Sequence, residues 1–242
     1  MEILHVQQTE STNDLIRTLH AKSPLEEGTV LVTHTQSNGR GQLNNSWEAE
    51  PGKNLTFSIL FRPHHIRPSE QFVLSQAVSL ALFDVLSKEA NGFSIKWPND
   101  IYWNDKKIAG ILIENDLHGN VIDQSVVGIG VNVNQHQFRS DAPNPISLSQ
   151  ITGKEYDLES LIEQFIDALL NRYDSTFDNG IDILRADYYQ SLFRVNKKAI
   201  YRDETGLFEG TIIGVLPSGH LQIQTQTNEL RLYAFKEVEF IL

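Results

Sequence analysis

The sequence predicts an α+β fold, in which a mixed or antiparallel sheet packed with helices is followed by a small C-terminal β-barrel. Up to residue 194, apolar runs bounded by glycine and proline alternate with segments of helical periodicity. From Lys197 onward the chain carries only short strand-like segments, separated by Gly206 and a turn at 217–219. We therefore expect a larger domain over residues 1–194 and a barrel domain over residues 195–242.

Composition and charge limit the classes of function. Apolar residues make up 40% and charged residues 21% of the 242-residue chain. No segment approaches the roughly 20 consecutive apolar residues of a membrane span, and no signal peptide is visible, so we expect a cytoplasmic protein. Lys and Arg number 20 against 31 Asp and Glu, and the net charge of −11 argues against DNA binding over a broad face. The absence of cysteine excludes disulfides, thiolate metal sites and a cysteine nucleophile.

The first predicted helix begins after a run of capping residues, Ser11, Thr12, Asn13 and Asp14. These residues serve either as a simple cap or as a ligand site, because the first amide groups of a helix are unpaired and carry the positive end of its dipole. The sequence alone leaves both interpretations open.

A buried strand over 28–34 leads into a loop that contains Gly39, Arg40 and Gly41. Glycine lets backbone amides approach an anion and arginine offers a bidentate fork, so this loop is either a phosphate cradle or an ordinary mobile loop. A turn at Pro51 and Gly52 precedes a strand over 54–61, which we expect to alternate between two faces. A long core helix is predicted from residue 72, with Ser69 and Glu70 as its cap and 91–92 as its end.

The stretch 96–113 predicts a β-hairpin with its turn at 104–106. Pro98 should lie at a strand end or bulge and force Lys96 and Asp100 off the regular ladder. The two arms could bring Lys96 and Lys107 to one end of a pocket, with Gly110 allowing a ligand close to the backbone. Two ammonium groups and a carboxylate indicate an anionic ligand; a buried hairpin with solvated lysines is the alternative.

A central strand over 124–134 contains two glycines, beside which we expect another group to pack closely. Asn132 and Asn134 share one face and either bind a base or ribose or cap the strand end. An amphipathic helix begins at Asp157, and a second covers 181–192. The barrel strands are expected over 199–202, 207–215, 220–226, 229–233 and 238–241. The eight histidines show no metal-ligand spacing.

Five motifs occur in an order that resembles the biotin protein ligase family. They are Ser11-Thr12-Asn13, Gln36 with Gly39-Arg40-Gly41 and Trp47, Lys96-Trp97-Pro98-Asn99-Asp100, Lys107-Ile108-Ala109-Gly110-Ile111-Leu112, and Gly128-Ile129-Gly130-Val131-Asn132. The resemblance covers the whole chain and implies a class II synthetase-like catalytic domain with an SH3-like C-terminal barrel. We expect the monofunctional form, without the N-terminal DNA-binding domain that some members carry.

The resemblance implies an ATP-dependent biotin-[acetyl-CoA-carboxylase] ligase. Biotin and ATP would form biotinyl-5′-AMP and pyrophosphate, and biotin would then pass to a lysine of a biotin carboxyl carrier protein. Mg²⁺ would accompany ATP, with Asp100 as its candidate ligand, and no tightly bound organic cofactor is expected. The implied catalytic residues are Lys107, Arg40 and Lys96. The implied biotin-binding residues are Ser11, Thr12, Asn13, Gln36, Gly39, Arg40, Gly41, Gln42, Lys107 and Gly110. The implied ATP- or adenylate-binding residues are Arg40, Trp47, Lys96, Asn99, Asp100, Lys107 and Asn132.

One departure and two alternatives qualify this interpretation. Many family members continue the loop as Gly-Arg-Gly-Arg-x-Gly, where this chain has Gln42 and Asn44, and the lost charge is expected to weaken retention of the adenylate. The alternatives are a lipoate or octanoate protein ligase and a non-catalytic biotin sensor. The Lys-Trp-Pro-Asn-Asp motif argues against the first, and the retained cations argue against the second. An exposed sheet edge could pair two copies as a homodimer or dock the carrier.

Overall fold

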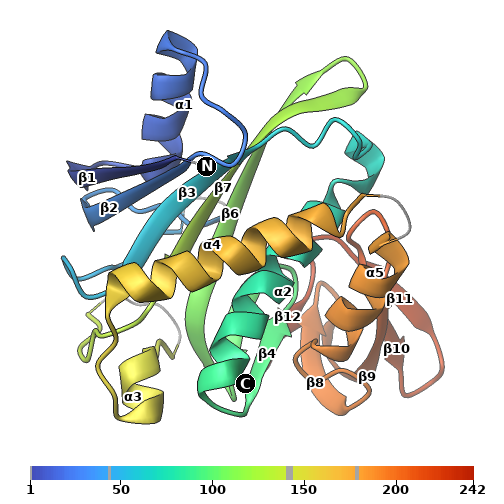
Figure 1. Ribbon diagram of the computed structural model, residues 1–242. Coiled ribbons are helices and arrows are strands. Elements are labelled where there is room, and N and C mark those ends of the chain that lie inside the picture. Colours follow the sequence, from blue (N-terminus) through green and yellow to red (C-terminus); the bar gives the residue numbers. More distant parts are fainter. Residues whose placement is uncertain (1, 43–44, 140–143, 178–179) are drawn as a thin grey trace.

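A seven-stranded mixed sheet forms the larger part of the protein (Figure 1). The computed structural model describes residues 2–42, 45–139, 144–177 and 180–242. The sheet order is β1 (Ile3–Thr9), β2 (Val30–Gln36), β3 (Leu55–Phe61), β7 (Val121–Val131), β6 (Lys106–His118), β5 (Asp100–Trp103) and β4 (Phe93–Lys96). Strands β1 and β2 are parallel, and every other neighbouring pair is antiparallel, which confirms the predicted mixed sheet.

Helices cover both faces of this sheet. Helix α1 (Thr12–Lys22) packs over β2, β3 and β7, while α2 (Phe72–Glu89) packs against α4 (Leu158–Asp174) and α5 (Gly180–Gln190) and over strands β4 to β6 (Figure 1). A short helix, α3 (Leu148–Thr152), follows β7 in the chain. None of the described helices is long and apolar enough to cross a membrane.

Strand β3 is buried on both faces, which corrects the predicted alternation. Its Leu55, Phe57, Ile59 and Phe61 belong to the main core under α2, and Leu60 packs with Ile16 of α1 in a second, smaller core. The pattern misleads because β3 lies in the middle of the sheet, where neither face meets water.

The starts of the helices follow local chemistry at two of three predicted caps, while helix α2 ends at Glu89 and not at the predicted 91–92. The Ser11 hydroxyl accepts from the backbone N–H of Asp14 at 3.3 Å, and Asp157 caps α4. The predicted cap at Ser69 and Glu70 is wrong: both lie in a 3₁₀ turn, Pro68–Glu70, and helix α2 begins after Gln71 without a side-chain cap. A proline at the start of a helical turn needs no hydrogen-bond donor, so the turn leads directly into the helix.

The stretch predicted as one hairpin forms three strands, β4, β5 and β6. Pro98 lies in the connection between β4 and β5, where its missing donor costs no ladder bond. Lys96 and Asp100 are therefore direct ladder partners, contrary to the expectation that they leave the ladder. A register shift occurs instead in the ladder between β5 and β6, at Ile101 and Tyr102.

The C-terminal segment forms a second, antiparallel sheet, as predicted. Its order is β11 (Leu230–Tyr233), β10 (Leu221–Thr225), β9 (Gly206–Val215), β8 (Lys198–Asp203) and β12 (Glu239–Phe240). This sheet adjoins the larger part of the molecule, since Trp97 Nε1 donates to the backbone oxygen of Gly219 at 2.9 Å.

Candidate active site

A cavity of about 810 Å³ lies where the larger sheet meets the C-terminal sheet. It is lined by the N-terminus of α1, the loop after β2, the turn between β4 and β5, strands β6 and β7, and residues from the end of the chain. Most residues predicted from the motifs line it: Ser11, Thr12, Asn13, Gln36, Arg40, Gly41, Gln42, Trp47, Lys96, Asn99, Asp100, Lys107 and Gly110. The cavity brings together segments that are distant in the sequence, while Asn44 lies outside the described residues.

The N-terminus of α1 is joined to the end of β2 by one amide group. Gln36 Oε1 accepts from the backbone N–H of Thr12 at 2.8 Å and from its hydroxyl at 3.2 Å. The helix start therefore presents hydroxyl and amide groups to the cavity, which suits a ligand that both donates and accepts hydrogen bonds.

Asn13 connects this helix to the sheet. Its Nδ2 donates to Glu114 Oε2 at 2.7 Å, and its Oδ1 accepts from the Ser58 hydroxyl at 2.6 Å. A Cβ atom at Gly128 would lie 2.3 Å from Asn13 Oδ1, so a side chain there would displace the Asn13 amide. This contact confirms the predicted close approach at the glycines of β7.

Trp47, which follows β2 in the chain, packs against strands β6 and β7 of the same sheet. A Cβ atom at Gly130 would lie 2.3 Å from its Cε2, and one at Gly110 would lie 3.1 Å from its Cζ3. Its Nε1 is buried without a hydrogen-bond partner among the described residues. The indole therefore forms one wall of the cavity directly over a pair of glycines.

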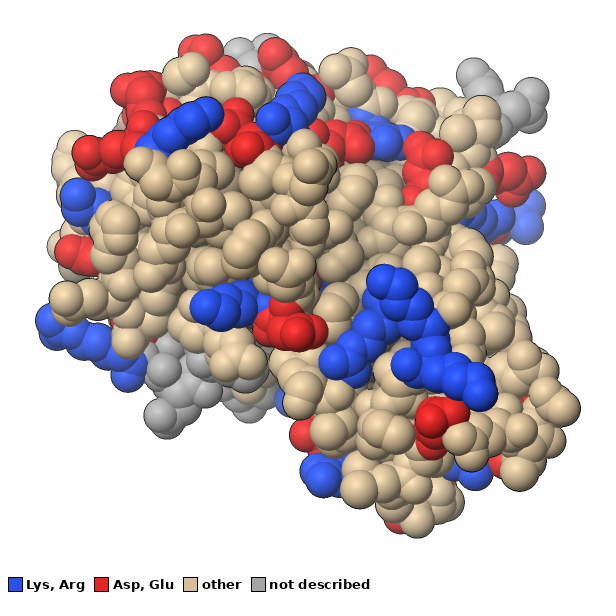
Figure 2. All heavy atoms as spheres, turned by 90° about the horizontal axis from the view of Figure 1, so that it is seen from below, with Lys and Arg blue, Asp and Glu red and all other residues tan. Residues whose placement is uncertain are grey.

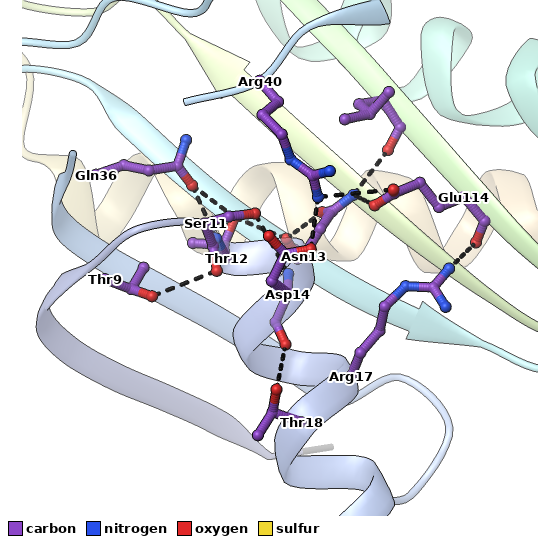
Figure 3. A network of polar contacts seen from close by, with 12 residues as sticks. Thr9, Ser11, Thr12, Asn13, Asp14, Arg17, Thr18, Gln36, Arg40 and Glu114 are labelled. Carbon is purple, nitrogen blue, oxygen red and sulfur yellow. Dashed lines mark hydrogen bonds and ion pairs between the residues drawn. The ribbon is translucent and has the colours of Figure 1, made fainter. Parts of the chain in front are cut away.

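Arg40 is held by two carboxylates beside the helix start (Figure 3). Its Nη2 lies 2.5 Å from Asp14 Oδ1 and 3.6 Å from Glu114 Oε1. Sequence reasoning singled out Arg40 but missed Glu114, although an acidic residue directly after the apolar run 108–113 was a usable signal. The guanidinium is thus already positioned at the cavity wall. An anionic ligand would have to compete with these two carboxylates for it.

The two predicted lysines differ in their surroundings. Lys107 Nζ lies 2.7 Å from Asp100 Oδ1 and 5.7 Å from the centre of a Trp47 ring. Burial lowers the pKa of Lys96, and the neighbouring Asp100 raises it only in part. Lys96 and Lys107 do line one cavity, as the spacing predicted, and both can face an anion.

Three other predicted residues are buried or lie outside the lining of the cavity. Asn99 is buried and donates to the backbone oxygen of Ile111. Asn132 is 3% exposed and donates to the backbone oxygen of Ile146 at 3.2 Å, while its Oδ1 has no partner among the described residues. Neither Asn132 nor Gly39 is among the described residues that line the cavity.

The C-terminal sheet also lines the cavity, which sequence reasoning missed. Arg202, Lys236, Glu239 and Phe240 all face it. Only three-dimensional packing brings this sheet beside the motifs, so no local pattern could have indicated it.

Charge is unevenly spread over the surface. On the face seen from below, several Lys and Arg side chains gather in one cluster and others lie apart from it, despite the net charge of −11 (Figure 2). Within the described ranges, no three His, Asp or Glu residues converge as a metal-binding group.

Comparisons with known proteins agree on one family. A sequence profile of the Biotin/lipoate A/B protein ligase family matches residues 5–132. Bifunctional ligase/repressor BirA of Bacillus subtilis is 28% identical over 222 residues, which cover 88% of this chain and 67% of that protein. Biotin--[acetyl-CoA-carboxylase] ligase of Paracoccus denitrificans is 29% identical over 222 residues, covering 88% and 90%. The structure of biotin protein ligase from Aquifex aeolicus in complex with biotin and ATP superposes with a TM-score of 0.77 at 25% identity, covering 98% of this chain and 97% of that one.

Proposed function

Because the chain belongs to the Biotin/lipoate A/B protein ligase family, we propose that it is an ATP-dependent biotin–protein ligase. The observation that carries this proposal is the convergence of Arg40, Lys96 and Lys107 on the cavity that also receives the polar start of α1. One part of the cavity then suits the neutral polar ring of biotin, and the other suits its carboxylate and the phosphates of ATP.

The first step joins two anions. A carboxylate oxygen of biotin attacks the α-phosphorus of ATP, the bond from that phosphorus to the bridging oxygen breaks, and pyrophosphate leaves with the electron pair. Fixed cations lower this barrier because they stabilise the charge that develops on phosphoryl oxygens. Lys107 is assigned to the carboxylate and the bridging oxygen, Arg40 to the α-phosphate and Lys96 to the nucleotide.

The polar ring of biotin would be read at the helix start. Its ureido group offers two N–H donors and one carbonyl acceptor, and the Ser11 hydroxyl, Thr12 and the Gln36 amide supply the complementary groups. Gly110 leaves room for close contact with the sheet.

Magnesium fits this site as a companion of ATP and not as a resident ion. Asp100 is the one predicted metal ligand, and one of its oxygens faces Lys107. Mg²⁺ is commonly held by one or two carboxylates together with substrate phosphates, so a single carboxylate beside the triphosphate suffices. When bound, the ion would neutralise phosphate charge.

The second step transfers the acyl group. The ε-amine of a lysine on a biotin carboxyl carrier protein attacks the carbonyl carbon of the adenylate, an amide forms, AMP departs with the electron pair, and the amine loses a proton. The loop that carries Arg40 and Trp47 would shield the mixed anhydride from water until the carrier arrives.

The test is exchange of pyrophosphate into ATP with Mg²⁺ and with biotin, lipoate or octanoate as the only added acid. Biotin-dependent exchange, followed by transfer of biotin to an isolated carrier domain, is the expected result. Exchange with lipoate or octanoate alone would move the function to the lipoate ligases of the same family. No exchange with any of the acids would favour a biotin sensor.

A further inference from the structure

The ammonium group of Lys96 is contacted by two aromatic residues, Tyr102 and Phe240. Its Nζ is 4.8 Å from the centre of the Tyr102 ring and 5.3 Å from that of Phe240, and it donates to the Tyr102 hydroxyl at 3.3 Å. Among the described residues, no carboxylate lies within ion-pair distance of Nζ, whereas Lys107 is bound to Asp100 at 2.7 Å. Of the two cavity lysines, Lys96 is thus the one that aromatic residues contact without a carboxylate partner.

The two rings come from different parts of the molecule. Tyr102 lies on β5 of the larger sheet and is 1% exposed, while Phe240 lies on β12 of the C-terminal sheet and is 8% exposed. Phe193 contacts both rings, with centroid distances of 5.8 Å to Tyr102 and 6.3 Å to Phe240. Tyr201 packs edge-on against Phe240 at 5.3 Å. Each ring is therefore fixed by other aromatic side chains.

The charged groups around Lys96 leave it available to an anion. The negative charges of Asp100 on β5 and Glu239 on β12 raise the pKa of Lys96. The positive charges of Lys107 and Arg194 lower it. A carboxylate in direct contact would compete with a phosphate for the ammonium, but the neutral Tyr102 hydroxyl and the Phe240 ring hold the cation without neutralising its charge. The two side chains can therefore orient Lys96 while it still lines the cavity.

We propose that Tyr102 and Phe240 are positioning residues that hold the Lys96 ammonium toward the phosphates of ATP, so that the C-terminal sheet completes the nucleotide site. This inference rests on the proposed function for the identity of the nucleotide. The contact between the rings and Lys96 can be tested without any ligase activity.

The first experiment detects the contact itself. Reductive ¹³C-methylation of lysines gives Lys96 an N-methyl signal, assigned by its loss in Lys96→Arg, and an ammonium beside the Phe240 ring should show an upfield-shifted signal. Phe240→Leu should move this signal downfield, because one ring is gone. An unshifted signal in the native protein, or one that Phe240→Leu leaves in place, would overturn the proposal.

The second experiment measures the dissociation constant of Mg·ATP by calorimetry, with no acid or carrier present. We expect Phe240→Leu to weaken binding roughly tenfold, in line with the usual strength of a partly desolvated cation–π contact. Phe240→Tyr keeps a ring and should restore most of the affinity. Phe208→Leu is the matched control, because Phe208 stacks on the same Tyr201 at 5.7 Å but is not among the described residues that line the cavity.

The outcomes separate this inference from the proposed function. Equal affinity for Mg·ATP in Phe240→Leu and the native protein, or equal losses in Phe240→Leu and Phe208→Leu, would overturn the positioning role. A shifted Lys96 signal with ring-dependent ATP binding would uphold it even if biotin supported no pyrophosphate exchange, and in that case the proposed reaction would be wrong while the positioning role stood.

Discussion

Gly110 and Gly130 pair directly across strands β6 and β7, and the indole of Trp47 rests against both of them. Neither glycine has the left-handed backbone that often explains glycine in a chain. A Cβ atom would clash with the indole at Gly130, at 2.3 Å, and would crowd it at Gly110, at 3.1 Å. The glycine pair thus fixes where the loop after β2 can return to the sheet, and with it the wall of the cavity.

Gly130→Ala should displace Trp47, because the new Cβ would lie 2.3 Å from the indole. We expect the free energy of unfolding to fall by about 1–3 kcal/mol, the usual cost of overpacking, and the tryptophan emission to change. Urea unfolding measures the first quantity. In a Trp47→Ala background the same substitution should cost much less, and equal costs in both backgrounds would show that Trp47 is not the obstacle.

Asp14→Asn should loosen the loop at Arg40 without changing overall stability. The Arg40 and Asp14 side chains are 39% and 59% exposed, so their ion pair contributes no more than about 1 kcal/mol. Limited trypsin cleavage after Arg40 should nevertheless become several-fold faster, since opening the loop no longer breaks this contact. Added salt should accelerate cleavage of the native protein more than that of the variant.

The control for this experiment is Glu10→Gln, which removes an exposed acidic residue close in sequence to the helix start. It should leave the cleavage rate unchanged. A rate that Asp14→Asn does not alter, or that Glu10→Gln alters equally, would mean that the ion pair does not restrain the loop.

Local chemistry predicted much of the fold and part of the site. The cap at Ser11 depends on only a few neighbouring residues and was predicted. The glycines at 128 and 130 indicated that another group packs closely on β7, but not that Asn13 and Trp47 are the residues that do so. Strand β1 was missed because it is a short edge strand whose apolar residues, Ile3, Leu4 and Val6, do not alternate strictly with polar ones. The alternation expected for β3 failed because its position in the middle of the sheet is a property of the whole topology.

The parts of the site that escaped prediction depend on contacts between distant segments. Arg40 meets Glu114 only because the loop after β2 folds over β6, and Phe240 meets Lys96 only because the C-terminal sheet closes against β4 and β5. Asn132 belongs to a motif that suggested an adenylate-binding role, which stays a prediction, and its side chain donates to the backbone oxygen of Ile146. The spacing of residues in the sequence does not reveal any of these contacts between distant segments.

Acid should weaken the C-terminal sheet through Asp203. Hydrogen bonds, first from Thr205 and then from Tyr233 and Arg231, hold the pKa of Asp203 well below its usual 3.8. The folded carboxylate therefore binds fewer protons than the unfolded one below pH 3.8, and its stabilisation is full above that pH and is lost as the pH falls further. Urea unfolding over the acid range should show this loss in the native protein and a smaller one in Asp203→Asn. The exposed neighbour Glu204 supplies the control Glu204→Gln, and an equal effect of both variants would contradict the assignment.

Lys107→Ala should abolish most adenylate formation while leaving the fold intact. Lys107 lines the cavity and lies 2.7 Å from Asp100, whereas the adjacent Lys106 is exposed and is not among the described residues that line the cavity. Removing one preorganised group that stabilises developing charge typically costs about 10²–10³ in rate. Biotin-dependent pyrophosphate exchange should fall by this factor in Lys107→Ala and stay near the native rate in Lys106→Ala. Both variants carry the same change in net charge, so a difference between them isolates position from charge. Near-native exchange in Lys107→Ala would remove this lysine from the mechanism and leave Arg40 and Lys96 as the cations that act on the phosphates.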